Sequence, residues 1–223
     1  VTVEGREDVY ERRLALYDAE IDEGKSTWKV TPLPFNDPAY SFAHPCISED
    51  GNTLYFISDK PGGYGGTDIY RVVRSNGTWG TPFNLGPVVN SAENEVFPFY
   101  VNNTLYFASA GHGGLGGHDL FQCTQTVNGF SPPENLGYPM NSTADDFSLI
   151  TTPDQHRGYF ASSRSGNDDL FFFRIPVPKV DIIAHVYDSL KNPIVEPQVQ
   201  LITSTVTDLT PDAQNTLRAQ AQW

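Results

Sequence analysis

The chain has 223 residues, of which 39% are hydrophobic and 13% aromatic, so it can bury the core of one large domain or of one domain with a small second one. Its 19 glycines, 17 prolines, 11 tyrosines and 14 phenylalanines favour strands and turns over helices. The net charge of −13 and the lack of a basic cluster argue against nucleic-acid and anionic-lipid partners, and no apolar run approaches the roughly 20 residues of a membrane-spanning helix.

Strands are predicted in chain order from alternating apolar residues between turn signals. After a mixed, charged segment at residues 1–13, two strands are expected at 14–21 and 26–33. The next region is expected to hold four strands, at 44–47, 54–58, 68–73 and 79–85. Four more are expected at 97–101, 105–109, 119–124 and 130–136, and an incomplete set from Phe147 to about Ile175.

The same supersecondary unit recurs along the chain. Trp28, Trp79 and Phe130 follow one another at intervals of 51 residues, and the glycine loop AGHGGLGG matches the earlier PGGYGG. The tails NLGPVVNSAENE and NLGYPMNSTADD also match. Four short strands repeated every ~50 residues are typical of β-propeller blades, so we predict an all-β propeller with at least four copies visible, the first and fourth incomplete.

The repeat pattern ends at Pro176-Val177-Pro178. Alternation resumes at 180–186 and 199–203, which predicts the start of a small β-sandwich. The predicted domains are therefore a propeller at 1–177 and a partial sandwich at 178–223, with no assignment for residues 210–223. Because the chain opens and closes inside structural units, we expect it to be a fragment of a larger protein.

The repeats resemble the WD-repeat-like, TolB-type propellers of outer-membrane-associated proteins of Bacteroidetes. The strings that carry this resemblance are NLGPVVNSAENEVFPF, TLYFASAGHGGLGGHDLF, NLGYPMNSTADDFSL and GYFASSRSGNDDLFFF. In that family the propeller is often followed by a carboxypeptidase-regulatory-like sandwich and an OmpA-type peptidoglycan-binding domain. Residues 180–202 are similar to the first part of such a sandwich, although His185 replaces the usual small residue and the OmpA-type domain is absent from this sequence.

This domain order is similar to that of the peptidoglycan-associated component of the type IX (Por) secretion and gliding machinery. The resemblance implies a non-enzymatic interaction scaffold in the periplasm, associated with the outer membrane and bound to other envelope or secretion-complex proteins. Peptidoglycan would be reached only through a domain outside this chain, and neither cofactors nor direct membrane insertion are expected. The alternative is a propeller-type glycan hydrolase or glycan-binding protein, because carboxylates on different blades can converge.

Several polar residues have a structural and a chemical interpretation. Asp68, Asp119 and Asp169 each precede a third strand, where a carboxylate can accept the N–H groups of the loop it closes. His112 and His118 are too few for zinc, and Asp145-Asp146 and Asn167-Asp168-Asp169 lack EF-hand spacing, so no metal site is assigned. Cys46 and Cys123 define neither a disulfide framework nor a zinc site, and no nucleophile motif or P-loop is present.

The connections divide into two groups by length. The turns after first and third strands are short, whereas the loops after second and fourth strands are long and lie on the opposite face. Long loops on a rigid scaffold commonly carry binding sites, so the partner is expected on the long-loop face, unless these loops only pack on one another. The expected contacts are Tyr64, His112, Leu115 and His118, with an acidic rim of Glu93, Glu95, Asp145 and Asp146.

Overall fold

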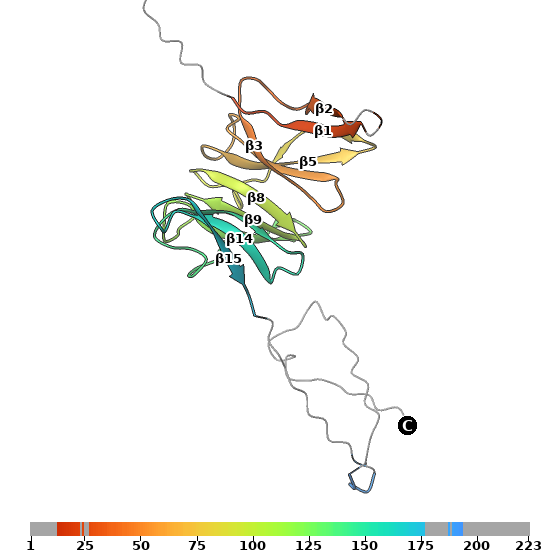
Figure 1. The fold of residues 1–223 in the computed structure, drawn as a ribbon, viewed down its shortest axis with the longest axis vertical. Coiled ribbons are helices and arrows are strands. Elements are labelled where there is room, and N and C mark those ends of the chain that lie inside the picture. The colour runs from red at the N-terminus through yellow and green to blue at the C-terminus, as the bar shows by residue number, and fades with distance from the viewer. Residues whose placement is uncertain (1–12, 23, 25–26, 177–186, 188, 194–223) are drawn as a thin grey trace, which may run out of the picture. The chain divides into compact units, whose positions relative to one another are not determined.

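The computed structural model describes residues 13–22, 24, 27–176, 187 and 189–193, which form strands and turns and no helix (Figure 1). Within these ranges nothing could cross a membrane as an apolar helix. The chain divides into two compact units, 1–177 and 178–223. In the second unit Tyr187 and Pro193 form an isolated antiparallel bridge, and the strands expected at 180–186 and 199–203, with His185, lie outside the described residues.

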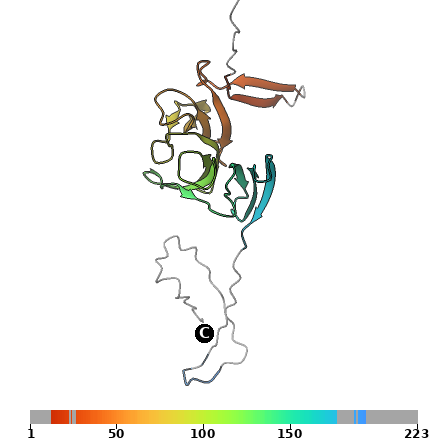
Figure 2. The same cartoon turned by 90° about the vertical axis from the view of Figure 1, so that its left-hand side faces the viewer.

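The first unit consists of antiparallel sheets that follow one another in chain order, from the orange hairpin to the blue β15 (Figure 2). The first repeat is a hairpin of β1 (Tyr17–Asp22) and β2 (Thr27–Pro32). The second repeat has β3 (Phe42–Ile47), β4 (Thr53–Ser58), β5 (Asp68–Ser75), β6 (Thr78–Trp79) and β7 (Phe83–Asn84). The third has β8 (Glu95–Val101), β9 (Thr104–Ser109), β10 (Asp119–Thr126), β11 (Gly129–Phe130) and β12 (Glu134–Asn135). The fourth has β13 (Asp146–Thr151), β14 (Arg157–Ser162) and β15 (Asp169–Arg174).

The fourth strand of each complete repeat is split, where the sequence predicted one strand at 79–85 and one at 130–136. In the second repeat β6 and β7 pair with different parts of β5. Gly80 and Pro82 lie between them, and Pro132 and Pro133 lie between β11 and β12. Proline has no N–H to donate and interrupts a ladder, so the outermost strand becomes two short segments.

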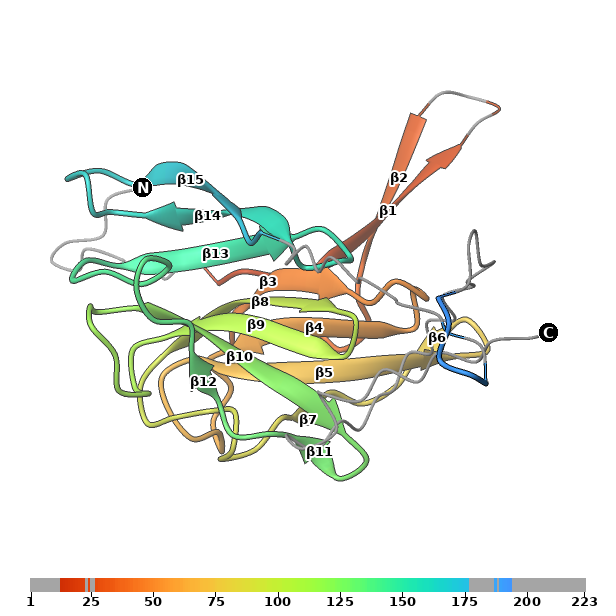
Figure 3. The same cartoon turned by 90° about the horizontal axis from the view of Figure 1, so that it is seen from below.

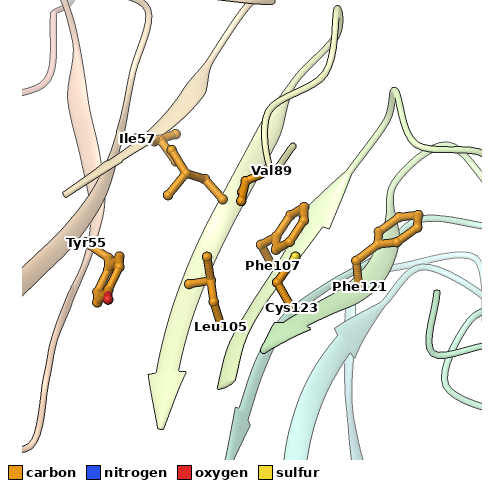
Figure 4. Close-up of a cluster of buried hydrophobic side chains, with 8 residues drawn as sticks. Tyr55, Ile57, Val89, Leu105, Phe107, Phe121 and Cys123 are labelled. Atoms are coloured by element: carbon orange, nitrogen blue, oxygen red, sulfur yellow. The ribbon is translucent and has the colours of Figure 1, made fainter. Parts of the chain in front are cut away.

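The sheets pack face to face through their apolar side chains. The first strands β3, β8 and β13 lie side by side (Figure 3). Between the second and third repeats, Tyr55, Ile57 and Ile69 meet Leu105, Phe107, Val89, Phe121 and Cys123 (Figure 4). The all-β antiparallel class is thereby confirmed, whereas the described residues do not form a closed ring of sheets.

The three aromatic residues spaced at 51-residue intervals have different surroundings. Phe130 packs edge-on against Tyr55 of the preceding sheet, with ring centroids 6.5 Å apart. Trp79 is half-buried against the cluster between the first and second repeats. The Trp28 side chain is 66% exposed, because no sheet precedes the β1–β2 hairpin in the described part of the chain. Phe130 and Trp79 thus pack between sheets, whereas Trp28 is exposed.

The first strand of the second, third and fourth repeats contains a bulge at an equivalent place. His44, Phe97 and Ser148 have φ values of 48°, 51° and 55°, and the pairing register shifts at each of these positions. The rings of His44 and Phe97 stack with centroids 3.8 Å apart, and the Phe97 N–H donates to His44 Nδ1 over 3.2 Å. Because Nδ1 accepts this bond, it carries no proton.

Candidate functional site

The glycine loops fold tightly around the aspartates that follow them. Asp68 accepts the Tyr64 N–H at 2.7 Å, and Asp119 accepts the Leu115 N–H at 2.8 Å, as expected. A Cβ added at Gly114 would lie 1.8 Å from Asp119 Oδ2, so this close approach requires glycine. Asp169 instead accepts the hydroxyl of Ser165, because the fourth-repeat loop is shorter.

Each glycine loop is also bonded to the tail that leads into the next sheet. The Thr67 N–H donates to Asn94 Oδ1 at 3.0 Å, and the His118 N–H donates to Asp145 Oδ1 at 2.7 Å. The backbone passes so closely that a Cβ on Gly116 would lie 1.9 Å from the Ala144 carbonyl oxygen. The long loops therefore form an interlocked layer, which favours the interpretation that they pack on one another.

Two members of the expected acidic rim are buried, which corrects that part of the prediction. Glu95 is fully buried and accepts the Ser91 N–H at 2.9 Å and the Ser109 hydroxyl at 2.7 Å. Asp146 is also fully buried and forms an ion pair of 2.6 Å with Arg164. Burial raises the pKa of Asp146, but hydrogen bonds from Ser162, Arg164 and Ser142 outweigh burial and hold it below its usual range. These carboxylates stabilise the loops rather than face a partner.

The remaining expected contact residues differ in accessibility. The His112 ring packs beside Phe121, with its Nε2 2.8 Å from the Val89 carbonyl oxygen, so it secures the glycine loop. His118 is half-buried, with Nδ1 3.6 Å from Asp145 Oδ1. The exposed members are Tyr64, Glu93, Leu115 and Asp145. Partner binding by these residues stays a prediction.

A polar groove lies on the other face, among the short turns. Its volume is about 360 Å³, and we call it the tyrosine groove; its lining includes Ser48, Glu49, Asp50, Tyr55, Arg71, Tyr100, Asn102, Asn103 and Gln125. It forms between the second and third sheets, because the turn after β3 and the turn after β8 stand side by side at the ends of packed strands. The sequence placed the expected binding site on the long-loop face, whereas this groove arises from two neighbouring sheets rather than from either turn.

The groove centres on two stacked tyrosines. The rings of Tyr55 and Tyr100 have centroids 4.9 Å apart. The Tyr100 hydroxyl donates to Asn103 Oδ1 or Gln125 Oε1, both within hydrogen-bonding reach. Burial raises the pKa of Tyr55, with the Tyr100 hydroxyl adding to the shift and Arg71 opposing it, so Tyr55 is neutral at physiological pH.

The groove carries charges of both signs. Arg71 lies beside Tyr55 and places its guanidinium 5.7 Å from the Phe83 ring centre. At the turn, hydrogen bonds from Ser48 and then from Asn52 hold the pKa of Asp50 below its usual range, so Asp50 is ionised. The groove thus offers a cation, carboxylates and neutral amides within one lining.

The described part of the chain contains neither a metal-binding cluster nor an activated cysteine. No group of three or more His, Cys, Asp or Glu side chains there could hold a metal ion. Cys46 and Cys123 are free thiols, and burial raises the pKa of Cys123 to about 12. A thiol with such a pKa stays protonated and is a poor nucleophile.

Comparisons with known proteins give structural likeness only. No family model matches the sequence, and no curated protein matches it. A puromycin-hydrolysing peptidase from Mycobacterium tuberculosis is similar at a TM-score of 0.45 and 15% identity, covering 70% of this chain and 25% of that one. A prolyl endopeptidase is similar at 0.40 and 17% identity, covering 69% of this chain and 22% of that one. The chain therefore spans about a quarter of the length of either structure.

These neighbours correct the functional expectation. The sequence implied a non-enzymatic scaffold of a secretion complex, and that prediction was wrong against these comparisons, since both structures are described as peptidases. The likeness is too low to transfer a mechanism or a site to this chain, and no peptidase residues are assigned.

Proposed function

We propose that residues 13–176 are part of a β-propeller whose short-turn face binds extended polypeptide in the tyrosine groove. The propeller is supported by the antiparallel sheets that repeat along the chain and by the adjacent first strands β3, β8 and β13. The sandwich after residue 178, the periplasmic location and the Bacteroidetes family remain predictions.

The observation that carries the ligand proposal is the mixture of groups around the stacked tyrosines. Polypeptide backbone presents donors and acceptors in alternation, and Asn102, Asn103 and Gln125 carry amides that can pair with both. The Tyr100 ring is half-buried and can receive an apolar side chain. A polyanion is disfavoured, because Arg71 is accompanied by Glu49 and Asp50.

Panning a random peptide library against the protein tests this proposal, followed by measurement of Kd for the selected peptides. Arg71→Gln removes a charge-assisted hydrogen bond, worth about 1.5–3 kcal/mol, and should weaken binding roughly 10- to 100-fold. Arg157→Gln is the matched control, because Arg157 is exposed on β14 away from the groove.

Two results would contradict the proposal. One is the absence of any selected peptide that binds in solution. The other is a set of peptides whose Kd is the same for Arg71→Gln and Arg157→Gln, which would place binding elsewhere on the protein.

A further inference from the structure

Each of the first three repeats is followed by a tail that leads to the next sheet. In each repeat, one residue of the chain segment next to the outermost strand has both its N–H and its C=O bonded by that tail. These residues are Leu16, Ile69 and Leu120. Their N–H groups donate to Asn36, Asn90 and Asn141 Oδ1 at 3.1, 2.8 and 2.7 Å. Their carbonyl oxygens accept from the same asparagines at 2.7, 3.1 and 2.9 Å, and from the N–H of Leu33, Leu85 and Leu136.

The tail has a fixed conformation in the two complete repeats, which share the pattern N-L-G-x-x-x-N. Asn84 Oδ1 accepts the Gly86 N–H and the Asn90 amide, each at 2.8 Å. Asn135 makes the same two bonds with Gly137 and Asn141. Gly86 and Gly137 have φ values of 87° and 64°, a conformation that suits glycine. The pattern therefore holds its second asparagine at the sheet edge through the same bonds in both repeats.

The fourth repeat has the same edge without this tail. Leu170 pairs with Ala161 in the register in which Ile69 pairs with Ile57 and Leu120 with Ala108. Its N–H and C=O therefore point away from β14, toward the outer side of β15, which lies at the margin of the sheets (Figure 3). In the described part of the chain no strand pairs with this side of β15.

The side chains beside this edge are also uncovered. Leu170 is 78% exposed, whereas Ile69 and Leu120 are 0% and 1% exposed. Tyr159 and Phe172 line a neighbouring groove of about 450 Å³ on the same sheet. An occupant must supply both backbone hydrogen bonds and an apolar side chain, which is what the leucine and second asparagine of the pattern supply in the preceding repeats.

We propose that the outer edge of β15 binds an extended protein strand that carries the pattern N-L-G-x-x-x-N. The side chain of the second asparagine of the bound strand accepts the Leu170 N–H and donates to the Leu170 carbonyl oxygen. The N–H of the leucine in the bound strand donates to the same carbonyl oxygen. The first asparagine donates to Asp169, as Asn84 donates to Asp68 over 2.8 Å. The partner is therefore a strand of this repeat type added to an open sheet edge, a mode in which main-chain bonds give affinity and side chains give specificity.

A synthetic peptide with the sequence of residues 81–92, TPFNLGPVVNSA, is the probe. Hydrogen exchange of the whole protein should show slower exchange of the Leu170 amide when this peptide is added, with no change at the tyrosine groove. The same peptide with alanine in place of its second asparagine loses two hydrogen bonds and should bind at least roughly tenfold more weakly.

Leu170→Pro is the matched change in the protein. Proline removes the N–H that the asparagine accepts and is tolerated on an edge strand whose N–H faces outward. Peptide binding should be lost while the melting temperature stays within a few degrees of the wild type. If the alanine peptide protects β15 equally well, or if neither peptide slows exchange there, the proposal is overturned, and these outcomes do not depend on how Leu170→Pro folds.

Discussion

The bonds of Asn90 to the strand edge can be tested by removing its side chain. Asn90 is buried, and its amide bonds both backbone groups of Ile69 and the side chain of Asn84. In Asn90→Ala the Ile69 N–H loses its partner. The Ile69 carbonyl keeps the bond from the Leu85 N–H, at 3.1 Å, so only one backbone group is left unpaired.

The expected loss of stability follows from these bonds. A buried donor without a partner costs about 1–3 kcal/mol, and a lost hydrogen bond between satisfied groups costs about 0.5–1.5 kcal/mol. Two such bonds are lost, to the Ile69 carbonyl and to Asn84 Oδ1, so the sum for Asn90→Ala is about 2–6 kcal/mol. Asn141→Ala breaks the equivalent bonds with Leu120 and Asn135 and should cost a similar amount; because the two sites share no partner, the double variant should cost the sum within about 0.5 kcal/mol.

Urea unfolding followed by tryptophan fluorescence measures these differences as a shift in the midpoint at constant m-value. Asn128→Ala is the control, because Asn128 is an exposed turn residue that bonds Thr126 through its backbone N–H, which alanine keeps, and such changes usually stay within about 0.5 kcal/mol. Hydrogen exchange of the Ile69 amide gives a second, local readout.

Two outcomes would contradict this prediction: a cost for Asn90→Ala no larger than that for Asn128→Ala, or an Ile69 amide as protected from exchange in the variant as in the wild type. Either outcome would mean that the backbone group finds another partner and that the asparagine is dispensable.

Three further changes test other parts of the fold. Burial lowers the pKa of His44, and its Nδ1 accepts the Phe97 N–H, so stability should be unaffected well above pH 6.5 and should fall as the pH drops from 6.5 toward the lowered pKa, measured by urea unfolding at pH 5 and pH 7.5. Gly116→Ala places a Cβ against the Ala144 carbonyl and should cost about 1–3 kcal/mol in the same assay. Arg164→Met leaves a buried carboxylate without its ion pair and should cost about 3 kcal/mol, the low end for a buried pair, because Arg164 is partly exposed.

Each of these changes has a matched control within the chain. His44→Phe keeps an aromatic ring and cannot titrate, and an unchanged pH slope in this variant would remove His44 as the cause. Gly113→Ala lies in the same loop as Gly116, where an added Cβ meets nothing within 4 Å, so equal costs for the two would contradict the close-approach argument. Arg157→Met removes an exposed arginine, and an equal effect would show that the buried pair contributes nothing specific.

The strands could be predicted from the sequence because their signals are local. Alternating apolar residues and Asp-Gly or Asn-Gly turns placed β4, β5, β9 and β10 within a few residues of their observed bounds. The split of the fourth strands was not predicted, although its signal is also local, because Pro82 and the pair Pro132-Pro133 stand inside the expected strands. The aspartates that close the glycine loops follow from the same local logic.

The site residues were not predictable in this way, because their partners are distant in sequence. Carboxylates are usually exposed, which made Glu95 and Asp146 look like rim residues. Their burial depends on Ser109 and Arg164, each brought close by strand pairing and loop packing. Tyr55 and Tyr100 belong to different repeats and meet only after two sheets pack, so no local pattern marks the groove.

The bonds between each glycine loop and the following tail also set an order in time. The Thr67 N–H can form its bond only after Asn94 has been made, 27 residues further along the chain. The His118 N–H likewise requires Asp145, again 27 residues later. At a synthesis rate of about 5–20 residues per second, each loop emerges roughly one to five seconds before its partner. The second and third repeats therefore cannot complete their loops as they leave the ribosome, and each one becomes fully ordered only when the start of its successor has been made.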